Sequence, residues 1–317
     1  MDSTDKREKA AVLLATYNGA DYLEIQIESL LAQTCQDFVI YVHDDGSFDK
    51  TPRLLLDYAD RYPSKIQLLK GKPLGGAKEN FLWMLSQVTA DYYFFCDQDD
   101  VWFPEKIEKS LDKIKSIGEG PRAVFSDMVV VDQDLEAIDQ SFISYIGRSP
   151  YNTAFSQILI DNPAAGCTLC MDHKLRDIVV EAAAKVDLKK IPMHDAFVLE
   201  LASLQGKVDV IAEPLVYYRQ TGHNQMGAET ETTGQKALRN VENAREGGIK
   251  ARKKAFINEA KTFAKEILKV DNIPQDKRGI LQEFVDLDSH GKLYRMHFYS
   301  KYNFTRAHHN LWMRLWV

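Results

Sequence analysis

A cluster of carboxylates at residues 97–100, reading Asp-Gln-Asp-Asp, is the strongest chemical signal in the sequence. It comes directly after the apolar run Tyr92 to Cys96, so Asp97 and Asp99 lie on a turn that follows a strand. Two carboxylates one residue apart can hold a divalent cation such as Mn2+ or Mg2+, which in turn can bridge two phosphate oxygens. The pattern indicates a nucleoside-diphosphate substrate; the alternative is an acidic turn without a ligand.

Two further polar segments each close an apolar run. Residues 16–19 read Thr-Tyr-Asn-Gly and residues 44–47 read Asp-Asp-Gly-Ser. A carboxylate can accept a hydrogen bond from the imide of uracil or thymine, and Tyr17 can stack on the base. Short polar side chains and backbone amides can take the ribose and phosphates. Each segment has an ordinary alternative as a turn or a helix cap.

The elements that must position these segments alternate between apolar runs and amphipathic stretches, which favours a βαβ series and an α/β fold. Strands are expected at residues 10–15, 38–42, 66–69, 92–96 and 123–131, and helices at 21–33, 51–62 and 78–88. In parallel sheets ligands bind beyond the carboxyl ends of the strands. The three polar segments are therefore expected at one sheet edge.

The second half of the chain is less regular. We expect an irregular stretch at 132–163, helices near 175–184 and 195–205, strands at 208–211 and 215–218, and helices around 256–268 and 280–285. The composition becomes polar after Gly227, so we place a domain boundary there. Residues 1–227 form the expected catalytic domain, and residues 228–317 form a helical C-terminal extension.

Residues 291–317 contain five Lys or Arg and no Asp or Glu, a net charge of +5 within a chain of net charge −6. Aromatic residues are interleaved among these basic ones. This composition suits the headgroup region of an anionic membrane. A terminal helix docked on the protein by its aromatic side chains would have the same composition, so both interpretations stay open.

The composition excludes several classes of protein. The chain has 317 residues, 45% of them hydrophobic, which is enough for one large or two smaller domains with a substantial core. Its acidic balance argues against a nucleic-acid binder. Four cysteines without a second CxxC motif exclude a disulfide scaffold and argue against structural zinc. No apolar run reaches the ~18 residues of a membrane span, and we expect no signal peptide.

Three motifs in order resemble the inverting family-two glycosyltransferases with the GT-A fold, and within them bacterial rhamnosyltransferase-type enzymes of cell-surface polysaccharides. The motifs are ATYNG at 15–19, DDGSFDKT at 44–51 and DQDDVW at 97–102. The resemblance covers about Ala10 to Gly227. It implies a Rossmann-type, mostly parallel central sheet with flanking helices.

The resemblance also implies roles for residues of the donor site. Base and ribose would be held by Thr16, Tyr17, Asn18, Asp44 and Asp45. Metal and diphosphate would be held by Asp97 and Asp99, and Asn80 of the segment GGAKENF would approach the donor.

Inverting transfer needs a base that deprotonates the acceptor hydroxyl. The family places this carboxylate at the start of a helix, and the matching position here is Asp195, preceded by His194. The alternative for Asp195 is a helix N-terminal residue favoured by capping and the helix dipole.

A late segment, YRQTGHN at 218–224, resembles the family's Tyr-Arg-Gln-His-Gly-x-Asn segment. Arg219 could meet a pyrophosphate. The usual histidine position is occupied by Thr221, and His223 follows two residues later, so His223 is the expected third metal ligand or else an exposed loop residue.

These observations predict an inverting, metal-dependent hexosyltransferase that moves a hexose or deoxyhexose from a UDP- or dTDP-sugar to a glycan acceptor on a lipid carrier or a protein. The acidic chain with its basic tail is expected in the cytoplasm, at the inner face of the bacterial membrane. The alternative is a non-catalytic partner or scaffold of a glycan-assembly complex. A nucleotide-binding oxidoreductase is disfavoured because the turn after the first strand lacks GxGxxG.

Overall fold

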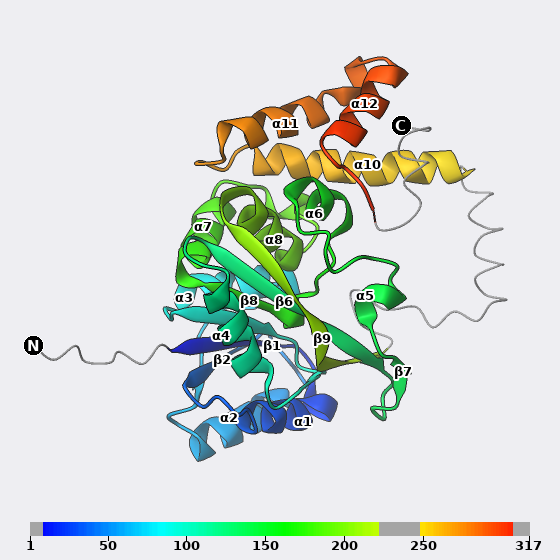
Figure 1. Ribbon diagram of the computed structural model, residues 1–317. Helices are drawn as coiled ribbons and strands as arrows, with labels where there is room; N and C mark the ends of the chain where they lie inside the picture. The colour runs from blue at the N-terminus through cyan, green and yellow to red at the C-terminus, as the bar shows by residue number, and fades with distance from the viewer. Residues whose placement is uncertain (1–8, 222–247, 307–317) are drawn as a thin grey trace, which may run out of the picture.

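The computed structural model describes residues 9–221 and 248–306 (Figure 1). Its first part is a regular βα series. The elements are β1 (Ala10–Thr16), α1 (Ala20–Leu31), β2 (Phe38–Asp44), α2 (Thr51–Arg61), β3 (Ile66–Leu68), α3 (Ala77–Gln87) and β4 (Tyr92–Cys96). All of these were expected within one or two residues of their ends, because apolar runs and helical spacing mark each one.

The middle part contains the remaining strands and the helices that cover them. Its elements are β5 (Val101–Trp102), α4 (Lys106–Ser116), β6 (Arg122–Val131), β7 (Ala137–Asp139), α5 (Phe142–Tyr145), α6 (Phe155–Asp161), β8 (Leu169–Asp172), α7 (His173–Ala183), α8 (His194–Gln205) and β9 (Lys207–Arg219). Two short 3-10 turns, Gly166–Thr168 and Leu188–Lys190, complete it.

The strands form one mixed sheet in the order β3-β2-β1-β4-β8-β6-β9-β5, with β7 paired to β6. The pairs among β1 to β4 are parallel, and β6 runs parallel to β9. The strand β8 lies antiparallel between β4 and β6, and β5 and β7 also pair antiparallel. The α/β class is confirmed, and the expected parallel arrangement holds in the β1–β4 half, while short inserted strands make the other half mixed.

The sheet has helices on both faces. Alternate residues of β1 point to opposite sides, with Val12 and Leu14 in the core under α1, α2 and α4 and Ala11 and Leu13 in the core under α3, α7 and α8. Figure 1 shows α1 and α2 on one side of the sheet and α7 and α8 on the other. Because β1 is buried along its whole length, it reads as a continuous apolar run.

The register brings the polar segments together, as the sequence predicted. Thr16, the last residue of β1, is aligned with Asp44 at the end of β2, and Leu14 is aligned with Cys96 at the end of β4. The three segments that follow these strands therefore emerge at one edge of the sheet.

The described C-terminal region is helical, with α10 (Gly248–Ile267), α11 (Gln275–Val285), a 3-10 turn Leu287–Ser289 and α12 (Lys292–Lys301). Its helix α10 lies against α6 (Figure 1). Phe284, Phe298, Tyr299 and Phe304 are buried together, so α12 is docked by its aromatic side chains. Residues 307–317 of the basic-aromatic tail lie outside the described residues. None of the helices in the described ranges is long and apolar enough to cross a bilayer.

The structure differs from the sequence expectation mainly between residues 132 and 218. The two late strands are one strand, β9, which passes through an irregular register at Pro214 rather than ending there. The stretch expected to be irregular contains β7, α5 and α6, and β8 follows it, directly after the small residues 164–168.

Candidate active site

A cleft of about 890 Å³ opens at the carboxyl edge of the sheet. Its walls include most of the residues selected from the sequence, namely Thr16, Tyr17, Asn18, Asp45, Asn80, Asp97, Asp99 and Asp195. These residues come from the ends of β1, β2 and β4 and from the starts of α3 and α8. The cleft therefore combines the acidic turn with the carboxylate selected as a base.

Hydrogen bonds join the loops after β1 and β2 to each other. Asp44 accepts from the Thr16 hydroxyl at 2.9 Å and from the backbone N–H of Ser47 at 2.9 Å. The Asn18 N–H donates to the Ser47 hydroxyl at 2.8 Å, and Asn18 lies in the left-handed region with φ 47°. Asp44 does not line the cleft, so its role in the structure is to fix these loops.

Asp45 binds a third loop. Its carboxylate accepts hydrogen bonds from the backbone N–H groups of Leu74, Gly75 and Gly76, at 2.9 and 3.0 Å for the two glycines. Gly75 has φ +82°, a conformation that favours glycine. Asp45 thereby holds the Gly-Gly loop at the cleft wall.

Gln98 was not selected from the sequence, yet it ties the acidic turn to the loop after β1. It accepts from the Tyr17 N–H at 2.8 Å and donates to the Tyr17 carbonyl at 2.9 Å. A Cβ at Gly19 would overlap the Gln98 amide, so the glycine permits this contact. The Tyr17 side chain is 53% exposed and lines the cleft, which leaves its ring free to face a ligand.

Asn80 is buried at the start of α3 and contacts the end of β2. Its Oδ1 lies 2.8 Å from His43 Nδ1, and its side chain also lines the cleft. The asparagine therefore fixes the strand end while it faces the site.

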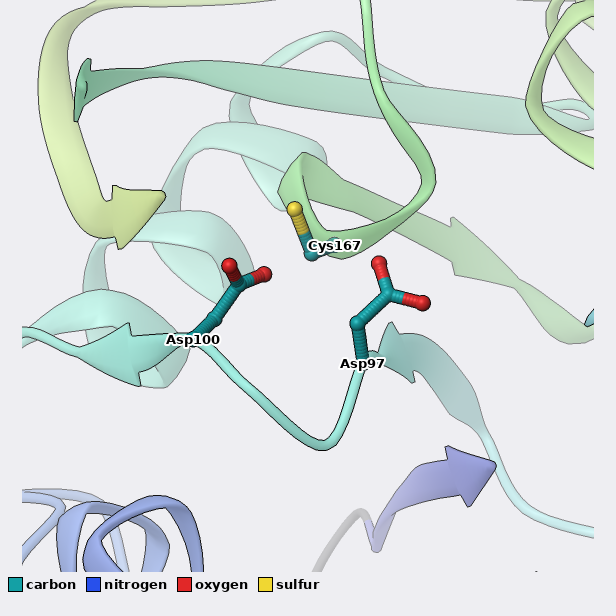
Figure 2. A group of neighbouring side chains, drawn as sticks. All are labelled: Asp97, Asp100 and Cys167. Carbon is teal, nitrogen blue, oxygen red and sulfur yellow. The ribbon is translucent and has the colours of Figure 1, made fainter. Parts of the chain in front are cut away.

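Two residues of the acidic turn belong to a group of possible metal ligands that differs from the pair expected from the sequence. Asp97, Asp100 and Cys167 offer ligand atoms within 4.8 Å of one another, and Figure 2 shows the two aspartates on either side of the turn with Cys167 above them. Burial, followed by repulsion from Asp99 and Asp195, raises the pKa of Asp97 to about 7. Burial also raises the pKa of Asp99 and that of Asp100.

These carboxylates fit a divalent cation. Asp97 and Asp99 face the cleft with oxygen ligands, the type that Mg2+ and Mn2+ take. Asp100 is fully buried, and its Oδ2 finds no hydrogen-bond partner in the described part of the chain. Raised pKa values among adjacent carboxylates indicate that the turn would be stabilised by a positive charge.

The side chain of Arg219, at the end of β9, binds the backbone of the acidic turn. Its Nε donates to the Asp99 carbonyl at 3.0 Å and its Nη1 to the Gln133 carbonyl, and its guanidinium lies 5.0 Å from the centre of the Tyr22 ring. Arg219 is not part of the cleft lining, whereas Thr221 is. The candidate metal ligand His223 lies outside the described residues.

Asp195 lies in the first turn of α8, 5% exposed and on the cleft wall. Burial raises its pKa to about 6, opposed by the Ala196 N–H, which donates to its Oδ1 at 2.5 Å, and by Arg148. The carboxylate is therefore poised to accept a proton near neutral pH.

His194, beside this aspartate, is packed between aromatic rings. Its ring lies 4.5 Å from that of Phe81 and 4.8 Å from that of Phe95, centre to centre, and burial lowers its pKa to about 3. A Cβ at Gly166 would overlap His194 Nε2. The histidine is consequently neutral and fixes the segment that contains Gly166 next to Asp195.

Solved structures define the class of this fold. The chain resembles S. aureus TarS 1-349 in complex with UDP-GlcNAc, with a TM-score of 0.56 and 16% identity over 92% of this chain and 72% of that one. It also resembles the mannosyltransferase PcManGT from Pyrobaculum calidifontis in complex with GDP-Man and Mn2+, with a TM-score of 0.55 and 13% identity over 94% of this chain and 74% of that one. It spans 42% of a longer TarS chain. The fold is that of the GT-A glycosyltransferases.

The family follows from sequence comparison. The family model named Glycosyl transferase family 2 matches residues 11–170, half of the chain, and the protein belongs to this family. A dTDP-rhamnosyl transferase, RfbG of Shigella flexneri, is 28% identical over 68% of this chain and 74% of its own length. An uncharacterised glycosyltransferase of Nostoc is also 28% identical, over 72% of this chain and 70% of its own.

Proposed function

We propose that this glycosyltransferase transfers a hexose or deoxyhexose with inversion from a UDP- or dTDP-sugar to a glycan acceptor, with Asp195 as the general base. The observation that carries the proposal is the position of Asp195 on the wall of the same cleft as Asp97 and Asp99. A buried carboxylate with a pKa of about 6 faces the turn that would hold the donor diphosphate.

The chemistry needs one proton acceptor and one site for the leaving group. Asp195 takes the proton of the acceptor hydroxyl as that oxygen bonds to the anomeric carbon. The bond from this carbon to the diphosphate oxygen breaks, and the nucleoside diphosphate leaves from the opposite face. Since attack and departure occur on opposite faces, the anomeric configuration inverts.

The donor side of the cleft is assigned to the loops after β1, β2 and β4. In this assignment Tyr17 stacks on the base and Asn80 approaches the sugar. The nucleoside is surrounded by Thr16, Asn18 and Asp45, together with the Gly75-Gly76 loop that Asp45 holds. Asp97 and Asp99 would hold Mn2+ or Mg2+, with His223, outside the described residues, as the proposed third ligand. Such a cation would supply positive charge opposite the diphosphate of the donor.

Two relatives support different donors. One is named as a dTDP-rhamnosyl transferase, and another structure was solved with UDP-GlcNAc. The dTDP-rhamnosyl transferase is more similar in sequence, at 28% identity, than the structure in complex with GDP-Man, at 13%. We therefore propose a pyrimidine nucleoside-diphosphate sugar as the donor class, and a glycan on a lipid carrier or a protein as the acceptor.

We further propose that the protein works at the cytoplasmic face of the membrane. On α12, Leu293 is 83% exposed, and Lys292 beside it is exposed too. An exposed apolar side chain next to basic ones suits an anionic lipid surface. Sedimentation with phosphatidylglycerol vesicles but not with phosphatidylcholine vesicles, lost in the double variant Lys292→Gln/Leu293→Gln, would support the contact. Equal sedimentation of the wild type with both vesicles or with neither contradicts it.

Transfer itself is tested with the variant Asp195→Asn. We expect it to bind the donor as the wild type does and to lose transfer by at least about 100-fold, because one general base contributes about 100-fold to 10,000-fold. Asp112→Asn, at an exposed position of α4, is the matched control and should keep full activity. Transfer by Asp195→Asn at the wild-type rate would remove the base assignment, and no transfer by the wild type with any UDP- or dTDP-sugar would favour the scaffold alternative.

A further inference from the structure

A buried aspartate joins the C-terminal region to the wall of the cleft. Asp161, the last residue of α6, is 1% exposed and lies between two arginines. Arg148 Nε is 3.3 Å from its Oδ1, and Arg306 Nη2 is 3.2 Å from the same oxygen. Arg306 follows α12, so this cluster connects residues far apart in the chain.

The cluster fixes the start of a segment that reaches the cleft. Arg148 Nη1 also donates to the carbonyl of Asn162, and the Asn162 side chain makes two hydrogen bonds of 3.1 Å with the backbone of Ala164. The next two residues, Ala165 and Gly166, line the cleft. The segment 161–166 is thus held at one end by the arginines and at the other by the packing of Gly166 on His194.

The charges of the cluster make its three members depend on one another. A buried carboxylate is costly unless it is paired, so loss of either arginine leaves Asp161 with less compensation. Arg148 also interacts favourably with the carboxylate of Asp195. The cluster therefore connects Arg306 to the side of the cleft that holds Asp195, whereas the loops after β1, β2 and β4 have their own hydrogen bonds.

We propose that Arg306 is a positioning residue for the transfer reaction, acting through Asp161 and Arg148 on the cleft segment 161–166 beside Asp195. The inference rests on the proposed function. It makes the C-terminal region a contributor to the rate of transfer and not to donor binding.

The test compares Arg306→Gln with two matched variants. Arg306→Lys keeps the charge. Lys185→Gln breaks a different ion pair between the catalytic region and the C-terminal region. Lys185 Nζ lies 2.5 Å from Asp271 Oδ2, and neither residue belongs to the Asp161 cluster or lines the cleft. The Arg306 side chain is 31% exposed, so its replacement leaves the apolar core intact. For each variant we would measure kcat, the donor Kd by calorimetry, and hydrogen exchange of the peptide that spans residues 161–166.

For Arg306→Gln we expect kcat to fall about 10-fold with the donor Kd unchanged, since a misplacement of 1 Å costs up to about 100-fold in rate. Exchange in residues 161–166 should accelerate in Arg306→Gln alone, while Arg306→Lys recovers most of the rate and Lys185→Gln behaves as the wild type. Equal effects of Arg306→Gln and Lys185→Gln, or unchanged exchange in 161–166, would overturn the inference. Because exchange needs no turnover, a wild type without transfer activity would refute the proposed function separately.

Discussion

Gln98 and Tyr17 are joined by a pair of hydrogen bonds between the Gln98 side-chain amide and the backbone of Tyr17. The acidic turn after β4 and the loop after β1 are thereby locked to each other. The residue between the two candidate metal ligands thus positions the aromatic ring that we assign to the base of the donor.

Replacing Gln98 by alanine should weaken donor binding. Both backbone groups of Tyr17 would lose their partner, and we expect a loss of about 1–3 kcal/mol, or about 5-fold to 150-fold in donor Kd. Calorimetry with the preferred nucleotide measures the change. Gln87→Ala, at an exposed position at the end of α3, is the control; a wild-type Kd for Gln98→Ala would show that the Tyr17 loop holds its position without this contact.

Transfer should be lost at acidic pH. The pKa of Asp195 is raised to about 6, and a base must be ionised to accept a proton. At saturating donor and metal, kcat should be constant above about pH 7 and fall about 10-fold for each unit below about pH 6. A rate that stays constant down to pH 5 would contradict the assignment of Asp195 as the base.

The carboxylate of Asp97 in the acidic turn should lower the free energy of unfolding at neutral pH when no metal is bound. The folded chain raises the pKa of Asp97 from 3.8 to about 7. Between these values the folded state binds a proton that the unfolded state releases, so this contribution to stability is lost as the pH rises toward 7. In chelator, Asp97→Asn should therefore gain stability relative to the wild type from pH 5 to pH 7.5, measured by urea denaturation.

Addition of Mn2+ provides the second half of that experiment. A ligand that binds only the folded state stabilises it, so Mn2+ should raise the stability of the wild type and not of Asp97→Asn. The exposed variant Asp112→Asn should follow the wild type in both buffers. An equal effect of Mn2+ on all three proteins would place the cation elsewhere.

Gly166→Ala should destabilise the protein. A Cβ there would overlap His194 Nε2, and the imidazole is confined by Phe81 and Phe95. We expect a loss of about 1–3 kcal/mol in the free energy of unfolding, as for other overpacked sites. Gly279→Ala, in α11 with no atom within 4 Å of the new Cβ, should instead gain about 0.5–1 kcal/mol. A neutral Gly166→Ala would mean that His194 moves freely.

The sequence predicts the strands and helices of the β1–β4 half and the sheet edge at which the cleft opens, for a physical reason. Each strand there is a short apolar run that ends in a polar turn, and parallel pairing places those turns at one edge. The register of Thr16 with Asp44 then follows from the fold class. Asp195 also lies on the cleft wall, where the resemblance to the family places it.

Other features of the site depend on contacts between residues far apart in the chain, which no pattern of neighbouring residues predicts. Gln98 looks like any polar turn residue, and its contact with Tyr17 exists only once β1 and β4 are adjacent. Cys167 comes from a distant segment to meet Asp97 and Asp100. The strand β8 was missed because it has only four residues and directly follows the small residues 164–168. Arg219 supports the acidic turn through hydrogen bonds to backbone carbonyls, a role that its charge does not reveal.

The central claim is a metal-dependent donor site in the cleft, and calorimetric titration with UDP and with dTDP tests it most directly. Each nucleotide would be titrated with Mn2+ and again with chelator, into the wild type and into Asp97→Asn. We predict that one nucleotide binds the wild type in the presence of Mn2+, and that chelator or the substitution weakens this binding at least about 10-fold, a change of about 1.4 kcal/mol. Binding of neither nucleotide, or binding that is indifferent to both the metal and Asp97, would contradict the account.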